Sequence, residues 1–179
     1  MRSVPRLGVA AALIVAAAVV VACGSEEEEL GVVEGEPVEL GTLLYNVQIT
    51  RFLNPSDPED RAYLRGQPVP RADEEYLAVF MTIDNEGSST ATVPEEFTIR
   101  DTRDNSYRSL DSDSVYALHP GAPLDPGEEV PSPDTPAASG PIKGAMVLFL
   151  VDRTVTENRP IELEIPSGSR ERARVELDI

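Results

Sequence analysis

Beyond residue 37, apolar and polar residues alternate along several short segments, and this period of two restricts the fold more than any other feature. Successive side chains of an extended strand point to opposite faces, so alternation predicts strands with one buried face. The first predicted strand carries Tyr45, Val47 and Ile49 on one face. Further strands are predicted over 76–83, 97–100, 145–151, 161–165 and 175–179. Segment 76–83 is apolar at nearly every position, which predicts a central strand covered on both faces.

No window of 11 residues after the N-terminal segment has the spacing of an amphipathic helix. Residues 37–179 are enough for one domain with a substantial core. Short strands without helices predict a sandwich or a barrel. Between the strands around Arg100 and Tyr107, the sequence Thr102-Arg103-Asp104-Asn105-Ser106 predicts a hairpin turn, because Asp and Asn tolerate the left-handed backbone conformation.

The N-terminus has the organisation of an export signal. Arg2 and Arg6 precede an unbroken apolar stretch, Val9 to Val21, and small residues follow. Thirteen apolar residues are too few for a bilayer span, which needs roughly 20. We therefore expect residues 1–22 to be a signal peptide that is removed on export.

The end of this signal, Val20-Val21-Ala22-Cys23, resembles the lipobox of bacterial lipoproteins. The resemblance implies that Cys23 becomes the lipidated first residue of the mature chain. It also implies an exported protein, anchored to the outer face of the cell membrane or in the periplasm. The alternative is an ordinary secretory signal in which Cys23, the only cysteine, is incidental.

The residues after Cys23 predict a disordered acidic tether over 23–36. Four consecutive glutamates, Glu26 to Glu29, repel one another and favour an extended chain. Residues 24–36 could reach about 40 Å when fully extended. The folded β-sandwich domain is then expected over 37–179.

The composition excludes several function classes. The chain has 15 Lys+Arg against 32 Asp+Glu, a net charge of −17, which becomes −19 once the two arginines of the signal are removed. Such acidity argues against a nucleic-acid partner, which needs a basic face. A single histidine and a single cysteine cannot form a zinc site from N and S ligands, and they leave no disulfide pair.

Four segments together resemble a group of exported or lipid-anchored bacterial immunoglobulin-like domains, related to secreted immunoprotective extracellular antigens. They are Gly41-x-x-x-Tyr45-x-Val47, the strand 76–85 ending in Thr82-x-x-Asn85, Phe97 to Asp101, and Leu124-Asp125-Pro126-Gly127-Glu128. The resemblance implies an all-β, antiparallel immunoglobulin-like β-sandwich of about seven to eight strands. With one cysteine and no tryptophan, the likeness to antibody domains is architectural only.

Two connections are unusually long for a compact domain: Leu53 to Glu75 and His119 to Pro141. The first contains Tyr63, Leu64 and Arg65, a composition favoured at protein-binding sites. We assign these three residues to partner binding, with packing over one end of the sandwich as the alternative. Whether both loops form one surface depends on the direction of the chain over 111–114.

The sequence offers little support for catalysis. His119 lies in a turn, no serine or cysteine stands in a nucleophile setting, and the abundant acids make any carboxylate pair uninformative. We therefore expect no enzyme activity, no catalytic residues and no metal ligands. Calcium is the one cofactor that acidic loops could hold. Its candidate groups are Asp101, Asp104 and Asn105; Asp111 and Asp113; and Asp57, Glu59 and Asp60.

These observations favour a lipid-anchored extracytoplasmic module that binds an envelope protein or polymer, or acts as an envelope accessory protein, without catalysis. One alternative is a calcium-stabilised structural domain with no specific ligand. A second is a weak hydrolase that uses two of its many carboxylates.

Overall fold

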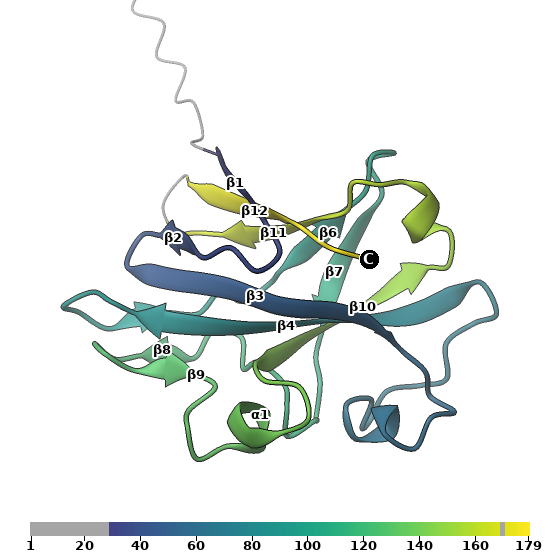
Figure 1. Ribbon diagram of the computed structural model, residues 1–179, viewed down its shortest axis with the longest axis horizontal. Coiled ribbons are helices and arrows are strands. Elements are labelled where there is room, and N and C mark those ends of the chain that lie inside the picture. Colours follow the sequence, from purple (N-terminus) through teal and green to yellow (C-terminus); the bar gives the residue numbers. More distant parts are fainter. Residues whose placement is uncertain (1–28, 169–170) are drawn as a thin grey trace, which may run out of the picture.

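The computed structural model describes residues 29–168 and 171–179, which form two facing β-layers (Figure 1). The predicted signal peptide and Cys23 lie outside the described residues. The all-β sandwich predicted from the sequence is confirmed. One layer holds β1 (Glu29–Val33), β12 (Arg172–Glu176), β11 (Glu162–Pro166) and β6 (Thr98–Arg100), in that order. The other holds β10 (Ala145–Asp152), β4 (Glu74–Asn85), β3 (Leu43–Leu53) and β2 (Val38–Leu40).

One strand, β7 (Ser106–Leu110), joins the two layers. Its first residues pair with β6, and Ser109 and Leu110 pair with β10. Two-residue strands add ladders at the ends: β9 (Glu129–Val130) pairs with β4, and β5 (Ala91–Thr92) pairs with β8 (Pro123–Leu124). The described residues therefore hold twelve strands rather than seven or eight. The additional strands are β1 and four strands of two or three residues, β2, β5, β8 and β9, which are too short to show a period in the sequence.

The helical segments are brief, in keeping with the absence of helical spacing. They are α1 (Pro136–Ser139) and two 3-10 turns, η1 (Asp60–Ala62) and η2 (Val155–Glu157). Within 29–168 and 171–179, no helix has the length and apolar character needed to cross a membrane.

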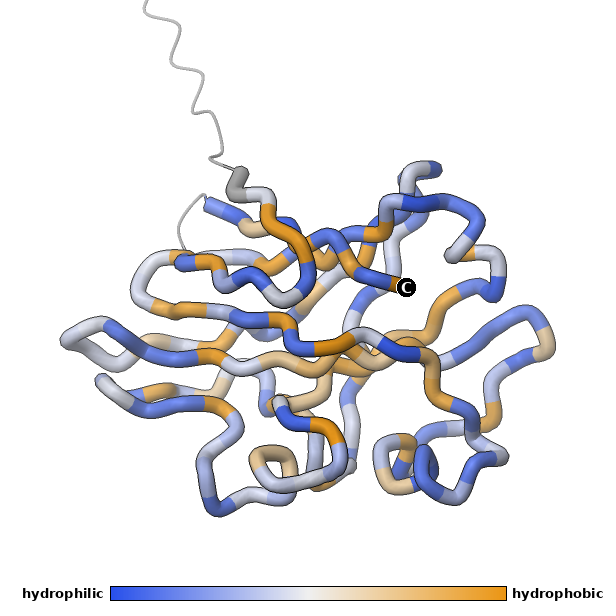
Figure 2. Tube along the Cα trace, in the orientation of Figure 1, coloured by the Kyte–Doolittle hydropathy of each residue, from blue (hydrophilic) through white to orange (hydrophobic). Residues whose placement is uncertain are grey.

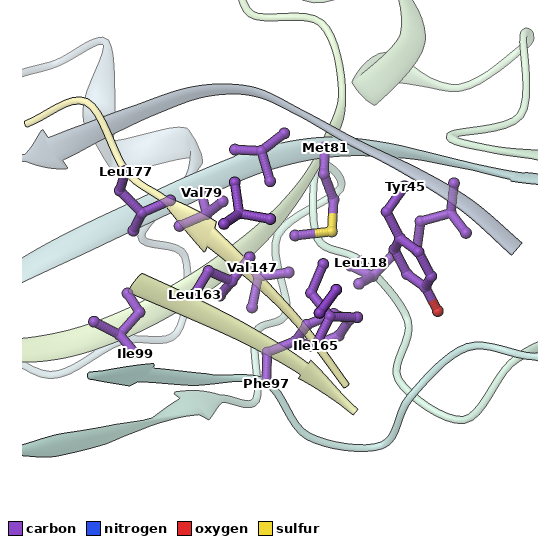
Figure 3. Packing of buried hydrophobic residues seen from close by; sticks show 14 of the residues in the cluster. Tyr45, Val79, Met81, Phe97, Ile99, Leu118, Val147, Leu163, Ile165 and Leu177 are labelled. Atoms are coloured by element: carbon purple, nitrogen blue, oxygen red, sulfur yellow. The ribbon is translucent and has the colours of Figure 1, made fainter. Parts of the chain in front are cut away.

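The two central strands β4 and β10 are buried on both faces, as predicted for 76–83. The inner face of β4, with Leu77, Val79 and Met81, packs into the core between the layers (Figure 3). Its outer face, with Tyr76 and Phe80, packs into a second apolar cluster beneath the long loops. Figure 2 shows the apolar residues concentrated along these strands, with mostly hydrophilic loops around them.

The prediction that Ile49 lies on the same face as Tyr45 and Val47 is wrong. A β-bulge in β3 shifts the register so that Val47 pairs with Met81 and Ile49 with Phe80, skipping Gln48. The extra residue reverses the direction of the side chains that follow it. Ile49 is accordingly 40% exposed, while Tyr45 and Val47 are buried.

The predicted tether 23–36 is wrong over its C-terminal part. Glu29 to Val33 forms β1, which pairs in parallel with β12, and Val32 packs against the core. Glu34 then fastens the chain to both layers. Its carboxylate accepts backbone N–H groups from Thr50 at 3.0 Å and from Asp178 at 3.1 Å. Of the acidic run, only Glu29 belongs to β1, so in the described part of the chain the sandwich begins at Glu29 rather than at residue 37.

Two of the sequence motifs behind the family resemblance meet in space. The Asn85 side chain donates to the carbonyls of Ser89 at 2.9 Å and Leu124 at 2.8 Å. The Asn85 main chain bonds to the turn of the other motif, accepting from Gly127 N–H and donating to the Glu128 carbonyl. Gly127 has a φ of +77°, which suits glycine. A buried asparagine at the end of β4 thus organises the Leu-x-Pro-Gly-Glu turn.

Candidate binding cleft

A cleft of about 940 Å³ opens at one end of the sandwich. It lies between the turn that joins β2 to β3, the segment from β5 to β6, and the hairpin that joins β11 to β12. Its volume falls within the range of small-molecule sites, about 300–1,000 Å³. The apolar residues that line it are Leu40, Leu43, Tyr45, Ala91, Val93, Pro94 and Pro166.

Tyr45 supplies a polar group to this apolar floor. The residue is 2% exposed, and its hydroxyl oxygen points away from the packed side chains of the core (Figure 3). No hydrogen bond joins that hydroxyl to another residue in the described part of the chain. Burial raises the pKa of Tyr45 above its ordinary value, so the hydroxyl stays protonated. It is therefore available both as a donor and as an acceptor for a ligand.

Acidic side chains surround the floor. Glu95 and Glu96 come from the segment before β6, and Glu164 and Glu171 from the β11–β12 hairpin, which also contributes Arg172. Glu96 pairs with Arg108 at 3.2 Å, and Glu164 pairs with arginines of its own layer. Glu95 is exposed at the mouth, where a carboxylate attracts groups of opposite charge and favours cationic or neutral ligands.

Glu164 is held by two arginines on the outer surface of its layer. Arg100 lies 2.8 Å from one carboxylate oxygen, and Arg174 lies 3.2 Å from the other. The hydrogen bond and charge of Glu164 raise the pKa of Arg100. These pairs leave Glu164 as a fixed structural charge at the edge of the cleft.

The residues predicted to bind a partner separate into two groups. Tyr63 and Leu64 are 4% and 7% exposed and lie in the outer cluster with Phe80. The Tyr63 ring meets the Phe80 ring edge-on, with centroids 5.4 Å apart, and lies 4.6 Å from the Tyr116 ring. Arg65 is exposed. The packing alternative therefore describes Tyr63 and Leu64, and Arg65 is the one of the three that faces solvent.

Asp60 holds this loop in place. Its carboxylate forms an ion pair with Arg51 of β3 and accepts the Asn54 N–H at 2.8 Å, while its carbonyl accepts from Tyr63 and Leu64. The bulge in β3 directs Arg51 outward, toward this loop. Asp60 is 2% exposed, so the ion pair is largely shielded on the carboxylate side.

The two long loops cover the same face of the molecule. The Ser114 hydroxyl donates to the Ala62 carbonyl at 2.9 Å, and the Gln67 side chain donates to the Asp111 carbonyl at 2.7 Å. Tyr116, which follows this junction, packs with Tyr63 on one side, and a Cβ at Gly140 would lie 2.9 Å from its ring. Residues 111–116 thus join the loops into one cover over β4 and β10, with η1 and α1 on the same side in Figure 1.

Three of the candidate calcium ligands, Asp101, Asp57 and Asp60, already accept hydrogen bonds or form an ion pair. One oxygen of Asp101 accepts N–H groups from Arg103 and Asn105, and the other accepts from the side chains of Asn105 and Asn158, all within 3.0 Å. These donors satisfy the carboxylate as a structural group in the confirmed hairpin, where Asp104 has a φ of +62°. Asp57 accepts from Glu59 N–H, and Asp60 pairs with Arg51. Across 29–168 and 171–179, no three His, Cys, Asp or Glu side chains converge in a way that could hold a metal ion.

His119 is exposed in a turn, where its carbonyl accepts the Ala122 N–H. It does not line the cleft. The cleft was not predicted from the sequence, because its residues come from three separated segments: 40–45, 91–98, and 164–168 with 171–172. The local signals are the motif Gly41-x-x-x-Tyr45 and the exposed pair Glu95 and Glu96, and an acidic pair is common in this chain.

The fold and the cleft define a β-sandwich protein with a cleft at one end.

Searches found no matching family model and no matching curated protein. Among solved structures, the chain is similar to the yjhA protein of Bacillus subtilis, with a TM-score of 0.54 and 17% identity over 82% of this chain and 99% of that one. It is also similar to an uncharacterised β-sandwich protein of Clostridium difficile, with a TM-score of 0.51 and 14% identity over 86% and 97% of the two chains.

Two further similar structures have names that refer to location. One is ycdA of Bacillus subtilis, a candidate lipoprotein, with a TM-score of 0.54 and 14% identity; the match covers 81% of this chain and 38% of that one. The other is MPT63, a secreted protein of Mycobacterium tuberculosis, with a TM-score of 0.50 and 14% identity over 83% and 97% of the two chains. Identities this low establish the shared β-sandwich fold alone.

Proposed function

We propose that the chain is a lipid-anchored, extracytoplasmic β-sandwich module that binds a ligand of the cell envelope in its end cleft, without catalysis. The observation that carries the proposal is the open cleft of about 940 Å³, with its apolar floor and the Tyr45 hydroxyl, which stays protonated and forms no hydrogen bond with the described residues. Concave, mostly apolar sites with a few polar groups are typical of ligand binding.

The location rests on the sequence around Cys23. A signal that ends in Val20-Val21-Ala22-Cys23 directs export and supplies the thiol for a lipid anchor. Two acyl chains are enough to hold a protein stably on a membrane. The names of two proteins with the same fold, a candidate lipoprotein and a secreted protein, agree with this location.

Binding rather than catalysis is favoured by the state of the polar groups at the cleft. Glu164 is neutralised by Arg100 and Arg174, and a carboxylate held in this way is a poor general base. Tyr45 keeps its proton because burial raises its pKa. These groups can recognise a ligand by charge and hydrogen bonding.

The anchor is tested by replacing its thiol. In cells fed a clickable fatty acid, the wild-type chain should carry the label, and Cys23→Ser should lose it because no thioether can form. Ser25→Ala, two residues away, should keep the label. A Cys23→Ser chain that is labelled as strongly as wild type would overturn the anchor.

Ligand binding is tested by filling the cleft. Thr92 is exposed and lines the cleft, so Thr92→Trp should block it without disturbing the core. Val115→Trp, at a site 57% exposed on the loop-covered side, is the matched control. Native mass spectrometry of the full chain should show a bound small molecule in wild type and Val115→Trp but not in Thr92→Trp. An equal ligand load in all three chains would contradict a cleft site.

A second candidate is docking of an envelope protein or polymer on the loop cover. The favouring observation is Val69, which is 86% exposed beside a small cavity of about 210 Å³ lined by Arg61, Leu64 and Tyr76. Arg65 is exposed on the same loop. In-cell crosslinking should then lose its partner on Val69→Asp with Arg65→Glu. The Ser88→Asp variant in an exposed turn should retain the partner, and retention by both variants would exclude this surface.

A further inference from the structure

The cleft lies at the end of the sandwich from which the chain leads back to Cys23. β1 begins at Glu29, and the register pairs Glu29 with Arg172, which lines the cleft. Figure 1 shows β1 and β12 beginning at the same end of the sandwich, where β11 ends. The cleft and the start of the described chain are therefore neighbours.

The chain between the anchor and the sandwich is short. Because β1 extends the domain to Glu29, only residues 24–28 separate Cys23 from its first residue. Six residue steps span no more than about 22 Å at full extension. If Cys23 is lipidated, as the proposed function requires, the end of the sandwich that holds the cleft cannot move far from the lipid headgroups.

We propose that the cleft receives an acyl chain of a membrane lipid whose headgroup carries an amine. This inference rests on the proposed lipid anchor. The floor formed by Leu40, Leu43 and Val93 suits a hydrocarbon chain, whose removal from water is favourable. The Tyr45 hydroxyl can donate to an ester carbonyl where the chain joins the headgroup.

The charge at the mouth selects the headgroup. Glu95 and Glu96 are exposed, and Glu96 also pairs with Arg108 at 3.2 Å, so Glu95 is the mouth carboxylate for which no ion pair forms among the described residues. Together with the acidity of the chain as a whole, it attracts a terminal ammonium and disfavours a headgroup with net negative charge. A lipid such as phosphatidylethanolamine satisfies both requirements, and phosphatidylglycerol does not.

Photolabelling of the full lipidated chain in vesicles tests the inference. Phosphatidylcholine vesicles would contain a small fraction of phosphatidylethanolamine or phosphatidylglycerol, each with the same photoreactive acyl chain. We expect labelled peptides from 40–45 and 91–96, several-fold stronger with phosphatidylethanolamine. Labelling confined to other segments, or equal labelling by the two lipids, would overturn the inference.

Variants separate the cleft from general proximity to the membrane. Thr92→Trp and Thr42→Trp fill the cleft from two exposed positions and should each reduce labelling of both segments several-fold. Tyr45→Phe removes only the hydroxyl and should reduce it less. Val115→Trp should label like wild type, and unchanged labelling in both cleft-filling variants would also overturn the inference.

Flotation of the same vesicles distinguishes the two proposals. A wild-type chain that floats with the vesicles but shows no label at 40–45 or 91–96 retains its anchor and contradicts the lipid site alone. A wild-type chain that does not float contradicts the anchor and, with it, the membrane-facing cleft. A chain that floats and is labelled at these two segments supports both.

Discussion

The two faces of the sheet that contains β4 and β10 are equally buried but differently covered. Leu77 and Phe149 on the inner face meet the strands of the opposite layer. Tyr76 and Phe80 on the outer face meet Tyr63 and Leu64, which come from a loop. A sheet buried on both faces normally has regular elements on each side. Here the loop 53–75 and the segment 111–116 take the place of a third layer of regular secondary structure.

The comparison shows that side-chain burial and backbone regularity are separate matters. The inner cover is fixed by ladders of hydrogen bonds between strands. The outer cover depends on single contacts, chiefly the Asp60 ion pair with Arg51, the Ser114 hydrogen bond to Ala62 and the ring contacts of Tyr63. Regions held by few contacts open at lower free energy than the core. The outer cover should therefore loosen while the sandwich stays folded.

The largest effect is expected from Phe149→Ala on the inner face. Phe149 is fully buried between the layers, and its truncation leaves a cavity that neighbouring strands cannot fill. The free energy of unfolding should fall by about 4 kcal/mol. Chemical denaturation with an unchanged denaturant slope would measure it, and a loss below that of Tyr63→Ala would reverse the order of the two faces.

Tyr63→Ala on the outer face should cost less, about 2–3 kcal/mol, because the loop can relax into the space. It removes the ring contacts with Phe80 and Tyr116. Hydrogen exchange should accelerate over 54–73 and 111–116 while β11 and β12 keep their protection. Uniform acceleration through the whole chain would mean that the outer cover is not a separate unit.

Asp60→Asn tests the main polar contact of the outer cover. It removes the charge that pairs with Arg51, and a hydrogen bond to a charged group contributes about 1.5–3 kcal/mol. We expect a loss near the lower end, about 1.5 kcal/mol, because Arg51 is partly exposed. Glu59→Gln, at the adjacent exposed position, should leave the denaturation midpoint unchanged. If the denaturation midpoint of Asp60→Asn equalled that of wild type, the ring contacts of Tyr63 alone would hold the loop in place.

The smallest expected effect is the loss of stability at acidic pH that comes from Asp101. Burial tends to raise the pKa of Asp101, but hydrogen bonds from Asn105, Arg103 and Asn158 outweigh it and hold the pKa below its ordinary value of 3.8. The folded chain therefore keeps this charge at a lower pH than the unfolded chain does. The resulting stability is present above pH 3.8 and is lost as the pH falls through the lowered value.

Urea midpoints at pH 5 and pH 3 would measure this contribution. The loss between the two values should be larger for wild type than for Asp101→Asn, which has no carboxyl to titrate. Asp104→Asn, in the same turn but exposed, should lose as much as wild type. Equal losses for wild type and Asp101→Asn would contradict the role of Asp101.

The sequence allowed the main strands and the all-β class to be predicted because alternation reports directly which side chains are buried. It did not reveal features that depend on a partner in space. Ile49 faces outward because of one extra residue in β3, which the local pattern does not show. β1 directly follows the acidic run 26–28 and shows no clear alternation, and it becomes a strand through its pairing with β12. Tyr63 could be assigned to surface or core only once its neighbours Phe80 and Tyr116 were known.

The candidate site was the least predictable part. The cleft is formed where three separate segments end, and its floor residues Leu40, Leu43 and Val93 have the same pattern as any core residue. Two of the motifs behind the resemblance to exported domains meet at Asn85, where they close the sandwich. A third motif, Gly41-x-x-x-Tyr45, contributes residues to the cleft, but its sequence alone did not indicate a ligand site.

The parallel pairing of β1 with β12 has a mechanical consequence. A force applied at the N-terminal end of β1 acts along the strand, so the hydrogen bonds of its ladder with β12 resist it together in shear. The two bonds that Glu34 accepts from Thr50 and Asp178 lie at the far end of β1 and add a second point of resistance. A chain held at its N-terminal end would thus be pulled in the direction in which the β1–β12 ladder resists most strongly.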